Sequence, residues 1–179
     1  MTSLTTRPTR ESDSQIIGEI SYRSHTISFA EFARAEFESE QVHAEHTEWW
    51  DRFLTPNDRG QHMFAVERDG VVIGFSMVGP LNDRYEFFEQ SKPLGAKGVL
   101  AVVYSIHIDP DHLGGGAGQA LMQMSLDYLR QAGFDTVVLD TFEVNQRARR
   151  FYEAGGWEVA RTAESHEDGT MAIYRLQLA

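Results

Sequence analysis

The most informative segment of the chain reads Asp109-Pro110-Asp111-His112-Leu113-Gly114-Gly115-Gly116-Ala117-Gly118-Gln119-Ala120-Leu121. It follows Val99 to Ile108, a nearly continuous apolar and β-branched run that is typical of a central strand buried on both faces. Apolar residues at helical spacing come next and predict a helix over Gly116 to Gln131. Four glycines in five positions leave backbone N–H groups uncovered where that helix begins, and the helix dipole adds partial positive charge there. The turn therefore predicts a binding site for an anion such as phosphate or diphosphate.

Other glycine-rich phosphate motifs fit this turn poorly. A Walker-type loop ends in Gly-Lys-Ser or Gly-Lys-Thr, and no lysine lies near the turn. A dinucleotide fingerprint would need its third glycine at Gln119 or Leu121, although Asp140 stands roughly where the ribose-binding acid of such a fold is expected. The strand opens at Val99, 80 residues before the last residue, which we expect to be too late for a full dinucleotide-binding fold. A glycine-rich turn without a ligand stays an alternative.

The length and composition indicate one soluble globular domain spanning residues 1–179. Hydrophobic residues make up 41% and charged residues 24% of the chain, and no run of about 18 apolar residues predicts a membrane span. Met1 to Arg10 lacks the apolar core of a signal peptide. The absence of cysteine excludes disulfides, thiolate nucleophiles and cysteine-based zinc sites. We therefore expect a cytoplasmic protein.

The charge balance is acidic. Sixteen Lys and Arg residues stand against 27 Asp and Glu residues, which gives a formal net charge of −11. An acidic surface repels phosphate backbones, so we expect no nucleic-acid partner. It attracts small cations, amines among them.

The remaining sequence alternates strand and helix patterns, which predicts an α/β or α+β fold. Arg68-Asp69-Gly70 predicts a hairpin turn, Glu11-Ser12-Asp13 offers N-cap chemistry, and Gly79 to Gly98 is predicted as a long excursion between strands. Further strands are predicted at Leu4–Arg7, Met63–Glu67, Val71–Val78, Thr136–Phe142, Trp157–Arg161 and Met171–Leu178. Further helices are predicted from Glu11 to Tyr22, over Ala30–Leu54 and over Asn145–Ala154.

A second motif follows the strand Thr136–Phe142 and reads Asn145-Gln146-Arg147-Ala148-Arg149-Arg150-Phe151-Tyr152-Glu153-Ala154-Gly155-Gly156-Trp157. With the glycine turn it resembles the GNAT superfamily of acyl-CoA-dependent N-acetyltransferases. The family's phosphate-binding pattern, Gln/Arg-x-x-Gly-x-Gly/Ala, maps onto Leu113 to Gly118. Its later pattern, Asn-x-x-Ala-x-x-Phe-Tyr followed by glycine and an aromatic residue, is matched by Asn145, Ala148, Phe151, Tyr152, Gly156 and Trp157. The two motifs lie 27 residues apart, from Gly118 to Asn145, which is the family's usual separation.

The resemblance implies a single α/β domain with a mixed, mostly antiparallel sheet flanked by helices. The strands Val99–Ile108 and Thr136–Phe142 would separate to admit acetyl-CoA. Asn145 would contact the pantetheine arm or a neighbouring backbone group, and Tyr152 would stand beside the thioester sulfur. The backbone groups that would pair with the pantetheine arm belong to Ile106, His107 and Ile108. The amides that would hold the CoA diphosphate belong to Gly114, Gly115, Gly116, Ala117, Gly118 and Gln119.

One residue departs from the family pattern. Leu113 stands where the family usually places Gln or Arg, a side chain that helps to hold the phosphates. The backbone cradle is kept, so we expect CoA to bind in this place with an affinity that Leu113 alters.

Acetyl transfer to an amine requires a neutral amine, a stabilised oxyanion and a protonated leaving thiolate. A lysine-like amine with a pKa of about 10.4 is neutral only about once in 2,500 at pH 7, which corresponds to about 4.6 kcal/mol. Tyr152 suits the acid role, because a phenol with a pKa of about 10 stays protonated at pH 7. The alternative is a tyrosine that only packs on the sheet. No covalent acyl-enzyme is expected, since cysteine is absent and no Ser–His arrangement is recognisable.

Several groups are candidates for the base. Val102 occupies the position where many relatives carry Glu, and valine cannot accept a proton. Tyr104 and His107 lie further along the same strand. His107 has a suitable intrinsic pKa, although a histidine in a buried strand is more often a packed core group. A water chain to bulk solvent is an alternative. So is the terminal loop, which carries His166, Glu167 and Asp168.

Other polar and aromatic residues have both functional and structural interpretations. His43 and His46, near Glu40, have the spacing of a metal site on a helix, but an exposed polar face explains them and we expect no metal. Two aromatic groups could wall an acceptor pocket or pack in the core: Trp49 with Trp50, and Tyr85 with Phe87 and Phe88. Three arginines could steer the CoA phosphates or balance nearby acids: Arg147, Arg149 and Arg150.

The sequence therefore predicts an enzyme that moves an acetyl group from acetyl-CoA to a primary amine of a small molecule by direct transfer. One alternative is a non-catalytic acyl-CoA-binding or regulatory module. Another is acetylation of protein N-termini or lysines. The acceptor depends on Ala30 to Gly60 and Gly79 to Gly98, where the resemblance is weakest. A homodimer is an open alternative, because similar proteins commonly dimerise.

Overall fold

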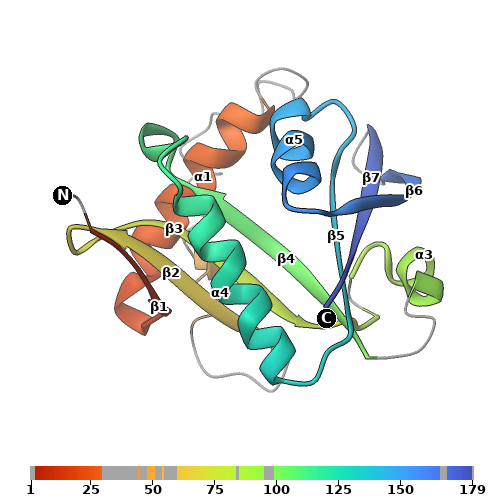
Figure 1. Cartoon of the computed structure of the whole chain (residues 1–179). Helices are drawn as coiled ribbons and strands as arrows, with labels where there is room; N and C mark the ends of the chain where they lie inside the picture. The colour runs from red at the N-terminus through yellow and green to blue at the C-terminus, as the bar shows by residue number, and fades with distance from the viewer. Residues whose placement is uncertain are drawn as a thin grey trace. The chain divides into compact units, whose positions relative to one another are not determined.

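The computed structural model describes residues 3–29, 44, 48–50, 54, 60–83, 85–94, 99–165 and 169–178. Figure 1 labels its elements. The strands are β1 (Leu4–Pro8), β2 (His62–Arg68), β3 (Val71–Pro80), β4 (Leu100–Ile108), β5 (Thr136–Phe142), β6 (Glu158–Ser165) and β7 (Gly169–Gln177). The α-helices are α1 (Ser14–Phe29), α3 (Phe88–Ser91), α4 (Ala117–Gln131) and α5 (Gln146–Ala154). The 3-10 helices are η1 (Glu11–Asp13), η3 (Lys92–Leu94) and η4 (Pro110–His112).

The strands form one seven-stranded sheet in the order β1-β2-β3-β4-β5-β7-β6. The strand β4 lies in the middle of this order, as its apolar sequence predicts. The pairs β1/β2, β5/β7 and β6/β7 are antiparallel, whereas β4 and β5 are parallel. A parallel pair needs a crossover between its strands, and α4 lies in that connection. The predicted mixed, mostly antiparallel α/β sheet is thus confirmed.

The chain divides into two compact units. The first consists of Met1–Met77 and Ser105–Ser125, and the second of Val78–Tyr104 and Leu126–Ala179. The strands β3 and β4 contribute residues to both units.

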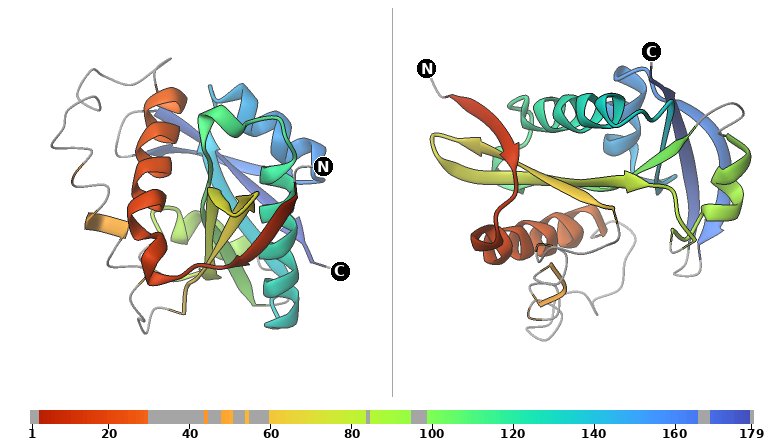
Figure 2. Two further views of the ribbon diagram at one scale, coloured as in Figure 1. Left: turned by 90° about the vertical axis from the view of Figure 1, so that its left-hand side faces the viewer. Right: turned by 90° about the horizontal axis from the view of Figure 1, so that it is seen from below.

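In the first unit, two helices cover opposite faces of β2 and β3 (Figure 2). The helix α1 contacts β4 through Ser24, whose hydroxyl lies 3.0 Å from Nδ1 of His107. The helix α4 contacts β3 through the buried pair of hydroxyls of Ser76 and Ser125, 2.8 Å apart. The hairpin turn between β2 and β3 is formed as predicted: Asp69 has a φ of 52° and Gly70 a φ of 83°.

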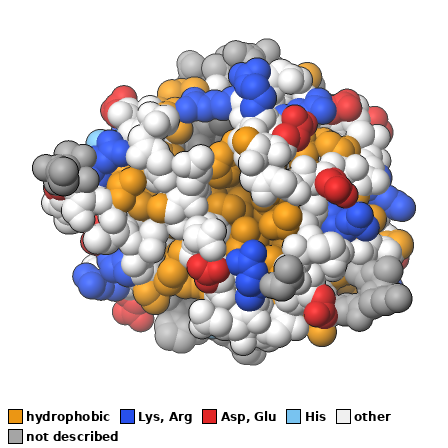
Figure 3. Space-filling model, viewed as in Figure 1, with side chains coloured by type: hydrophobic (Ala, Val, Ile, Leu, Met, Phe, Trp, Pro, Cys, Tyr) orange, Lys and Arg blue, Asp and Glu red, His pale blue; other side chains and the backbone are white. Residues whose placement is uncertain are grey.

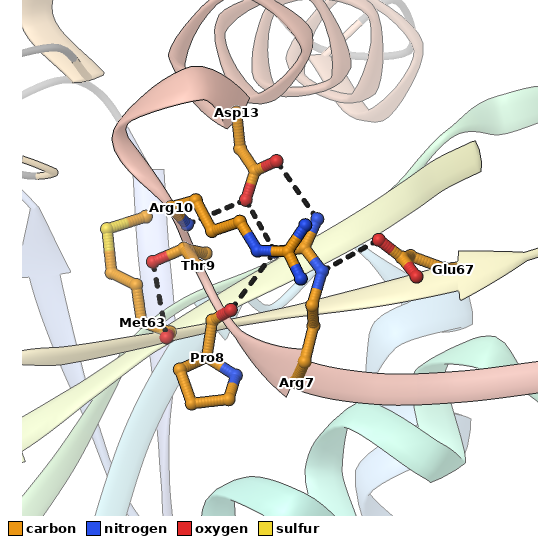
Figure 4. A network of polar contacts seen from close by, with 7 residues as sticks. All are labelled: Arg7, Pro8, Thr9, Arg10, Asp13, Met63 and Glu67. Carbon is orange, nitrogen blue, oxygen red and sulfur yellow. Dashed lines mark hydrogen bonds and ion pairs between the residues drawn. The ribbon is translucent and has the colours of Figure 1, made fainter. Parts of the chain in front are cut away.

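A partly buried ion-pair network joins β1 to the start of α1 (Figure 4). The guanidinium of Arg7 donates to both oxygens of Asp13, at 2.7 and 3.0 Å, and to Glu67 at 2.7 Å. Asp13 also accepts from the backbone amide of Arg10 at 2.7 Å. Burial alone raises the pKa of Asp13, but the hydrogen bonds from Arg7 and Arg10 outweigh it and hold that pKa below its ordinary value.

This network corrects the predicted helix start. Arg10 is the capping residue, and Asp13 reaches back to its amide instead of serving as an N-cap itself. The helix also runs to Phe29, past the predicted end at Tyr22. Its last turns are mostly polar, so the apolar pattern stops before the helix does. In these turns the hydroxyl of Thr26 donates to the carbonyl of Tyr22 at 3.0 Å.

In the second unit, side chains cover both faces of β5 and β7. One face carries a buried cluster of Tyr85, Phe87, Val102, Val138, Met171 and Ile173. On the other face α5 packs through Tyr152, whose ring centroid lies 5.5 Å from that of Tyr174. Arg149 Nε donates to the Tyr174 hydroxyl at 3.2 Å. The predicted excursion over Gly79 to Gly98 contains the short helices α3 and η3, and Tyr85 and Phe87 prove to be core residues.

The parallel pairing of β4 with β5 is short. It joins Leu100 to Thr136, Ala101 to Val137 and Val102 to Val138. Both strands continue beyond these pairs, and β5 pairs with β7 along its whole length, from Thr136 to Phe142. Within the second unit, the register thus leaves the next residues of β4 and β5 outside the ladder, as expected for two strands that separate.

Part of the predicted helix Ala30–Leu54 lies outside the described residues. Ala44, Glu48–Trp50 and Leu54 are helical. Trp50 is buried, with its ring centroid 4.6 Å from that of Phe75, and so serves the core, whereas Trp49 is 43% exposed. His43, His46 and Glu40 lie outside the described residues, as do His166, Glu167 and Asp168.

Candidate functional site

The glycine turn begins at a fixed end of β4. The amide of Asp109 donates to the carbonyl of Ile73 on β3 at 2.8 Å, and the side chain of Asp109 caps η4 by accepting from the amide of Asp111 at 2.9 Å. From α1, Arg23 donates to both carboxylates, at 2.7 Å to Asp109 and 2.8 Å to Asp111. These contacts hold the entry to the turn in one position, and Leu113 follows with its side chain 37% exposed.

The glycines of the turn have specific backbone requirements. Gly114 has a φ of 76° and Gly116 a φ of 83°, a region that costs a residue with a Cβ atom roughly 1–2 kcal/mol. At the start of α4, the amide of Ala120 donates to the carbonyl of Gly116 at 3.0 Å. The amides of the first turn of a helix have no partner within the helix. The turn and helix start therefore present backbone donors of the kind that bind a phosphate.

Arg68, at the end of β2, lies against this turn and was not identified from the sequence. Its Nη2 donates to the carbonyl of Gly115 at 3.3 Å, and a Cβ atom at Gly115 would collide with that same nitrogen. Among the described residues, the buried Nε of Arg68 has no hydrogen-bond partner. Because a trans peptide points its C=O and N–H in opposite directions, the bond to Gly115 turns the amide of Gly116 away from Arg68. Arg68 thus orients a turn donor and brings a positive charge that Leu113 lacks.

His107 lies on β4 with its ring packed in the first unit. Its ring centroid is 5.2 Å from that of Phe75 and 4.7 Å from that of His25, and Nδ1 is 3.0 Å from the hydroxyl of Ser24. The strand β3 approaches closely here, since a Cβ atom at Gly74 would come within 2.8 Å of the His107 carbonyl. These contacts describe a packed histidine. A catalytic use of His107, and the pairing of pantetheine with Ile106, His107 and Ile108, stay predictions.

A polar cluster in the second unit includes Asp140 on β5 and reaches Tyr104 on β4 through Tyr85. The hydroxyl of Tyr85 donates to Asp140 Oδ1 at 2.5 Å. On β4, the hydroxyl of Tyr104 donates to the carbonyl of Pro80 at 2.6 Å and accepts from Asn82 Nδ2 at 3.0 Å. The rings of Tyr85 and Tyr104 meet edge to face, with their centroids 5.9 Å apart.

The environment of Asp140 changes its acidity. Burial raises its pKa to about 6; the hydrogen bond from Tyr85 opposes this shift and the charge of Glu86 adds to it. Burial and the neighbouring Asp140 raise the pKa of Tyr85 well above its ordinary value. A carboxylate that titrates near neutral pH in an apolar surrounding is a recognised sign of a functional site. The acidic residue within a buried strand was the available sequence signal, but the sequence did not reveal Tyr85 as its partner.

Tyr152 lies on α5 and is 7% exposed. Burial raises its pKa, and the charges of Asp140 and Tyr174 add to the effect. The phenol therefore stays protonated throughout the neutral range and serves as a hydrogen-bond donor.

Asn145 precedes α5 and caps it. Its Oδ1 accepts from the amide of Ala148 at 3.0 Å. Of the two partners expected for Asn145, the structure shows the neighbouring backbone group. Of the three arginines, Arg149 binds the carbonyl of Glu143 at 3.2 Å in addition to Tyr174, whereas Arg147 and Arg150 are exposed.

The surface carries charges of both signs. On the face seen in Figure 3, Lys and Arg side chains stand among Asp and Glu side chains. Within the described ranges, no three His, Asp or Glu side chains gather as a metal site would require. No helix of the described part is long and apolar enough to cross a membrane.

Comparison with known proteins identifies relatives. The model of the acetyltransferase (GNAT) family matches residues 26–157, which is more than half of the chain. A mycothiol acetyltransferase of Thermobispora bispora is 35% identical over 94 residues, covering 52% of this chain and 29% of that protein. A mycothiol acetyltransferase of Saccharomonospora viridis is 32% identical over 116 residues, covering 63% and 35%. The chain thus matches about a third of the length of these relatives.

Solved structures share the fold along the whole chain. The PaiA N-acetyltransferase from Thermoplasma acidophilum, in complex with coenzyme A, matches with a TM-score of 0.76 at 15% identity, covering 98% of this chain and 99% of that one. The ribosomal-protein-S18-alanine N-acetyltransferase from Escherichia coli matches with a TM-score of 0.68 at 18% identity, covering 99% and 95%. At such identities the likeness concerns the fold alone.

Proposed function

Because the chain belongs to the acetyltransferase (GNAT) family, we propose that it moves an acetyl group from acetyl-CoA to a primary amine of a small molecule by direct transfer. The observation that carries this proposal is the glycine turn at the start of α4, with positive φ at Gly114 and Gly116 directly before the first helical turn. The mycothiol acetyltransferases among the relatives support the activity.

The turn would hold the diphosphate of acetyl-CoA. The donors are the backbone amides from Gly114 to Gln119, and the dipole of α4 adds to their attraction for an anion. Arg68 acts as a positioning residue, because its bond to the Gly115 carbonyl orients the next amide. It also supplies positive charge beside a turn in which Leu113 replaces the usual polar side chain.

Tyr152 would assist the departure of the thiolate. The raised pKa of its phenol makes complete proton loss to a thiolate of pKa about 8.5 unfavourable, so its main contribution is a hydrogen bond to the negative charge that develops on sulfur. A proton from solvent or from the acceptor amine completes the thiol. Direct attack by the amine fits a chain without cysteine.

The proposal is tested by the release of free thiol from acetyl-CoA with a panel of amines that includes an amino-acid amide, a diamine, an aminosugar and a lysine-containing peptide. The expected result is thiol release that depends on a small amine, with the acetylated amine identified by mass spectrometry. Release with the peptide alone would support a protein acetyltransferase instead. Binding of coenzyme A without thiol release on any amine would support a non-catalytic module and overturn the proposal.

A further inference from the structure

Asp140 is a carboxylate in an apolar part of the second unit. Its neighbours on the same face of the sheet belong to the buried cluster of Val102, Val138 and Ile173. Among the described residues, no Lys or Arg forms an ion pair with it, and its side-chain donor is the hydroxyl of Tyr85. Burying a carboxylate without a cation costs stability, so packing alone does not account for an aspartate at this position.

Asp140 lies just beyond the point where the ladder between β4 and β5 ends. Val138 pairs with Val102 in the last registered pair of β4 and β5, and Asp140 lies two residues further along β5 on the same face. Tyr104 occupies the equivalent position on β4. The two polar side chains thus flank the point where the ladder ends, while β7 still pairs with β5 at Asp140 through Ile173.

We propose that Asp140, held in place by the hydroxyl of Tyr85, is the general base that accepts the proton of the acceptor amine. This inference rests on the proposed acetyl transfer and adds to it the base that the sequence left undetermined. Asp140 lies on β5, whereas the candidates from the sequence were His107 on β4, the terminal loop and a water chain.

The proposed step transfers the acetyl group directly from sulfur to nitrogen. The amine nitrogen forms a bond to the acetyl carbon, and its proton passes to the carboxylate of Asp140. The carbon–sulfur bond breaks with its electron pair remaining on sulfur, and the Tyr152 hydroxyl donates a hydrogen bond to the thiolate. Asp140 then releases one proton to solvent, and the thiolate takes up one proton from solvent. The products are therefore an amide and free thiol.

The acidity of the cluster agrees with this assignment. With a pKa of about 6, Asp140 is about nine-tenths ionised at pH 7 and yet about a hundredfold more basic than an ordinary aspartate. Two titratable groups from the segment before α3 act on it, Tyr85 and Glu86. Asp140 in turn helps to raise the pKa of Tyr85 and of Tyr152 on α5. The raised pKa values of Tyr85 and Tyr152 keep both phenols protonated near pH 7.

The test compares pH–rate profiles for thiol release with a fixed amine at saturating acetyl-CoA. For Asp140→Asn we expect turnover at pH 7 to fall by at least about 100-fold and the decline in rate near pH 6 to disappear, with the affinity for coenzyme A unchanged. Asp127→Asn is the matched control, because Asp127 is an exposed aspartate on α4, and it should keep the wild-type profile.

A second variant tests the role of Tyr85 separately. The hydrogen bond from Tyr85 lowers the pKa of Asp140, so Tyr85→Phe should move the decline in rate to higher pH while activity returns in alkaline solution. This shift keeps the inference testable if Asp140→Asn does not fold, and a purely structural pair would not produce it.

The outcomes separate the two proposals. Suppose that the wild-type protein releases thiol but the pH–rate profile is unchanged in Asp140→Asn or unshifted in Tyr85→Phe. Either result overturns the inference and leaves the proposed function standing. Absence of thiol release by the wild-type protein on every amine overturns the proposed function and this inference with it. Loss of the decline in rate near pH 6 in Asp140→Asn, together with its shift to higher pH in Tyr85→Phe, supports Asp140 as the general base.

Discussion

Comparing Gly116→Ala with Gly133→Ala should separate the effect of backbone strain on stability from the effect of the turn on coenzyme A affinity. Gly116 has a φ of 83° and Gly133 a φ of 85°. A Cβ atom at Gly116 would lie 3.9 Å from Leu4 Cδ1, and one at Gly133 would have nothing within 4 Å, so neither variant introduces a clash. Each should lose roughly 1–2 kcal/mol of stability from backbone strain, or about 2–8 °C in melting temperature.

Only the variant in the turn should lose affinity for coenzyme A. The amide of Gly116 is the donor that Arg68 orients, and a hydrogen bond to a charged group contributes about 1.5–3 kcal/mol. Calorimetry should therefore show binding about 10- to 150-fold weaker for Gly116→Ala and unchanged for Gly133→Ala. If both variants bound coenzyme A as the wild type does, or if both lost affinity equally, the assignment of the turn would be refuted.

Three further outcomes follow from other contacts. Replacing Arg68 by methionine should weaken coenzyme A binding by about 2- to 12-fold, measured by calorimetry, because it removes one hydrogen bond of about 0.5–1.5 kcal/mol that positions the turn; equal affinity would contradict the positioning role. Arg7→Met should cost about 3–5 kcal/mol in urea unfolding at pH 7, because it leaves the buried carboxylate of Asp13 without its cation. Lys92→Met in an exposed ion pair should cost about 0.5 kcal/mol or less. The folded pKa of Asp13 is lowered, so the stabilisation by its ionised form is present above the unfolded pKa of about 3.9 and is lost as the pH falls through the folded value. The unfolding free energies of the wild type and of Arg7→Met should therefore converge in acid. Tyr152→Phe should lower turnover at least about tenfold in thiol-release assays without changing the affinity for coenzyme A, and unchanged turnover would remove its assigned role.

The parts of the fold that depend on local patterns could be predicted from the sequence. The apolar run of β4 predicts its central position, and Asp69-Gly70 predicts the hairpin turn. The glycine turn is also readable, because positive φ and a helix start depend on neighbouring residues. The extent of α1 was not readable, since its last turns carry polar side chains that break the apolar period.

The pairings that complete the candidate site join residues far apart in the chain. Arg68 and Gly115 are 47 residues apart, and Tyr85 and Asp140 are 55 residues apart. A single sequence carries the chemical type of each residue but not its partner. Gly115 illustrates the difference. The sequence suggests that glycine is needed there to leave a backbone amide uncovered, whereas the structure adds a second reason: Arg68 occupies the space that a Cβ atom would need.

The assignment of Asp140 depends on the same kind of information. In the sequence it is an acid near the end of a buried strand, and its ordinary pKa would make it a weak base. Burial and the contact with Tyr85 become visible only when β5 and the segment before α3 are brought together. Val102, which lacks a proton-accepting group, lies in that same cluster.

The most direct measurement is a crystal structure of the protein with coenzyme A. We expect the two phosphates of the diphosphate to accept hydrogen bonds from backbone amides between Gly114 and Gln119, with the guanidinium of Arg68 still bound to the carbonyl of Gly115. Density for the diphosphate on any other part of the chain would contradict the account.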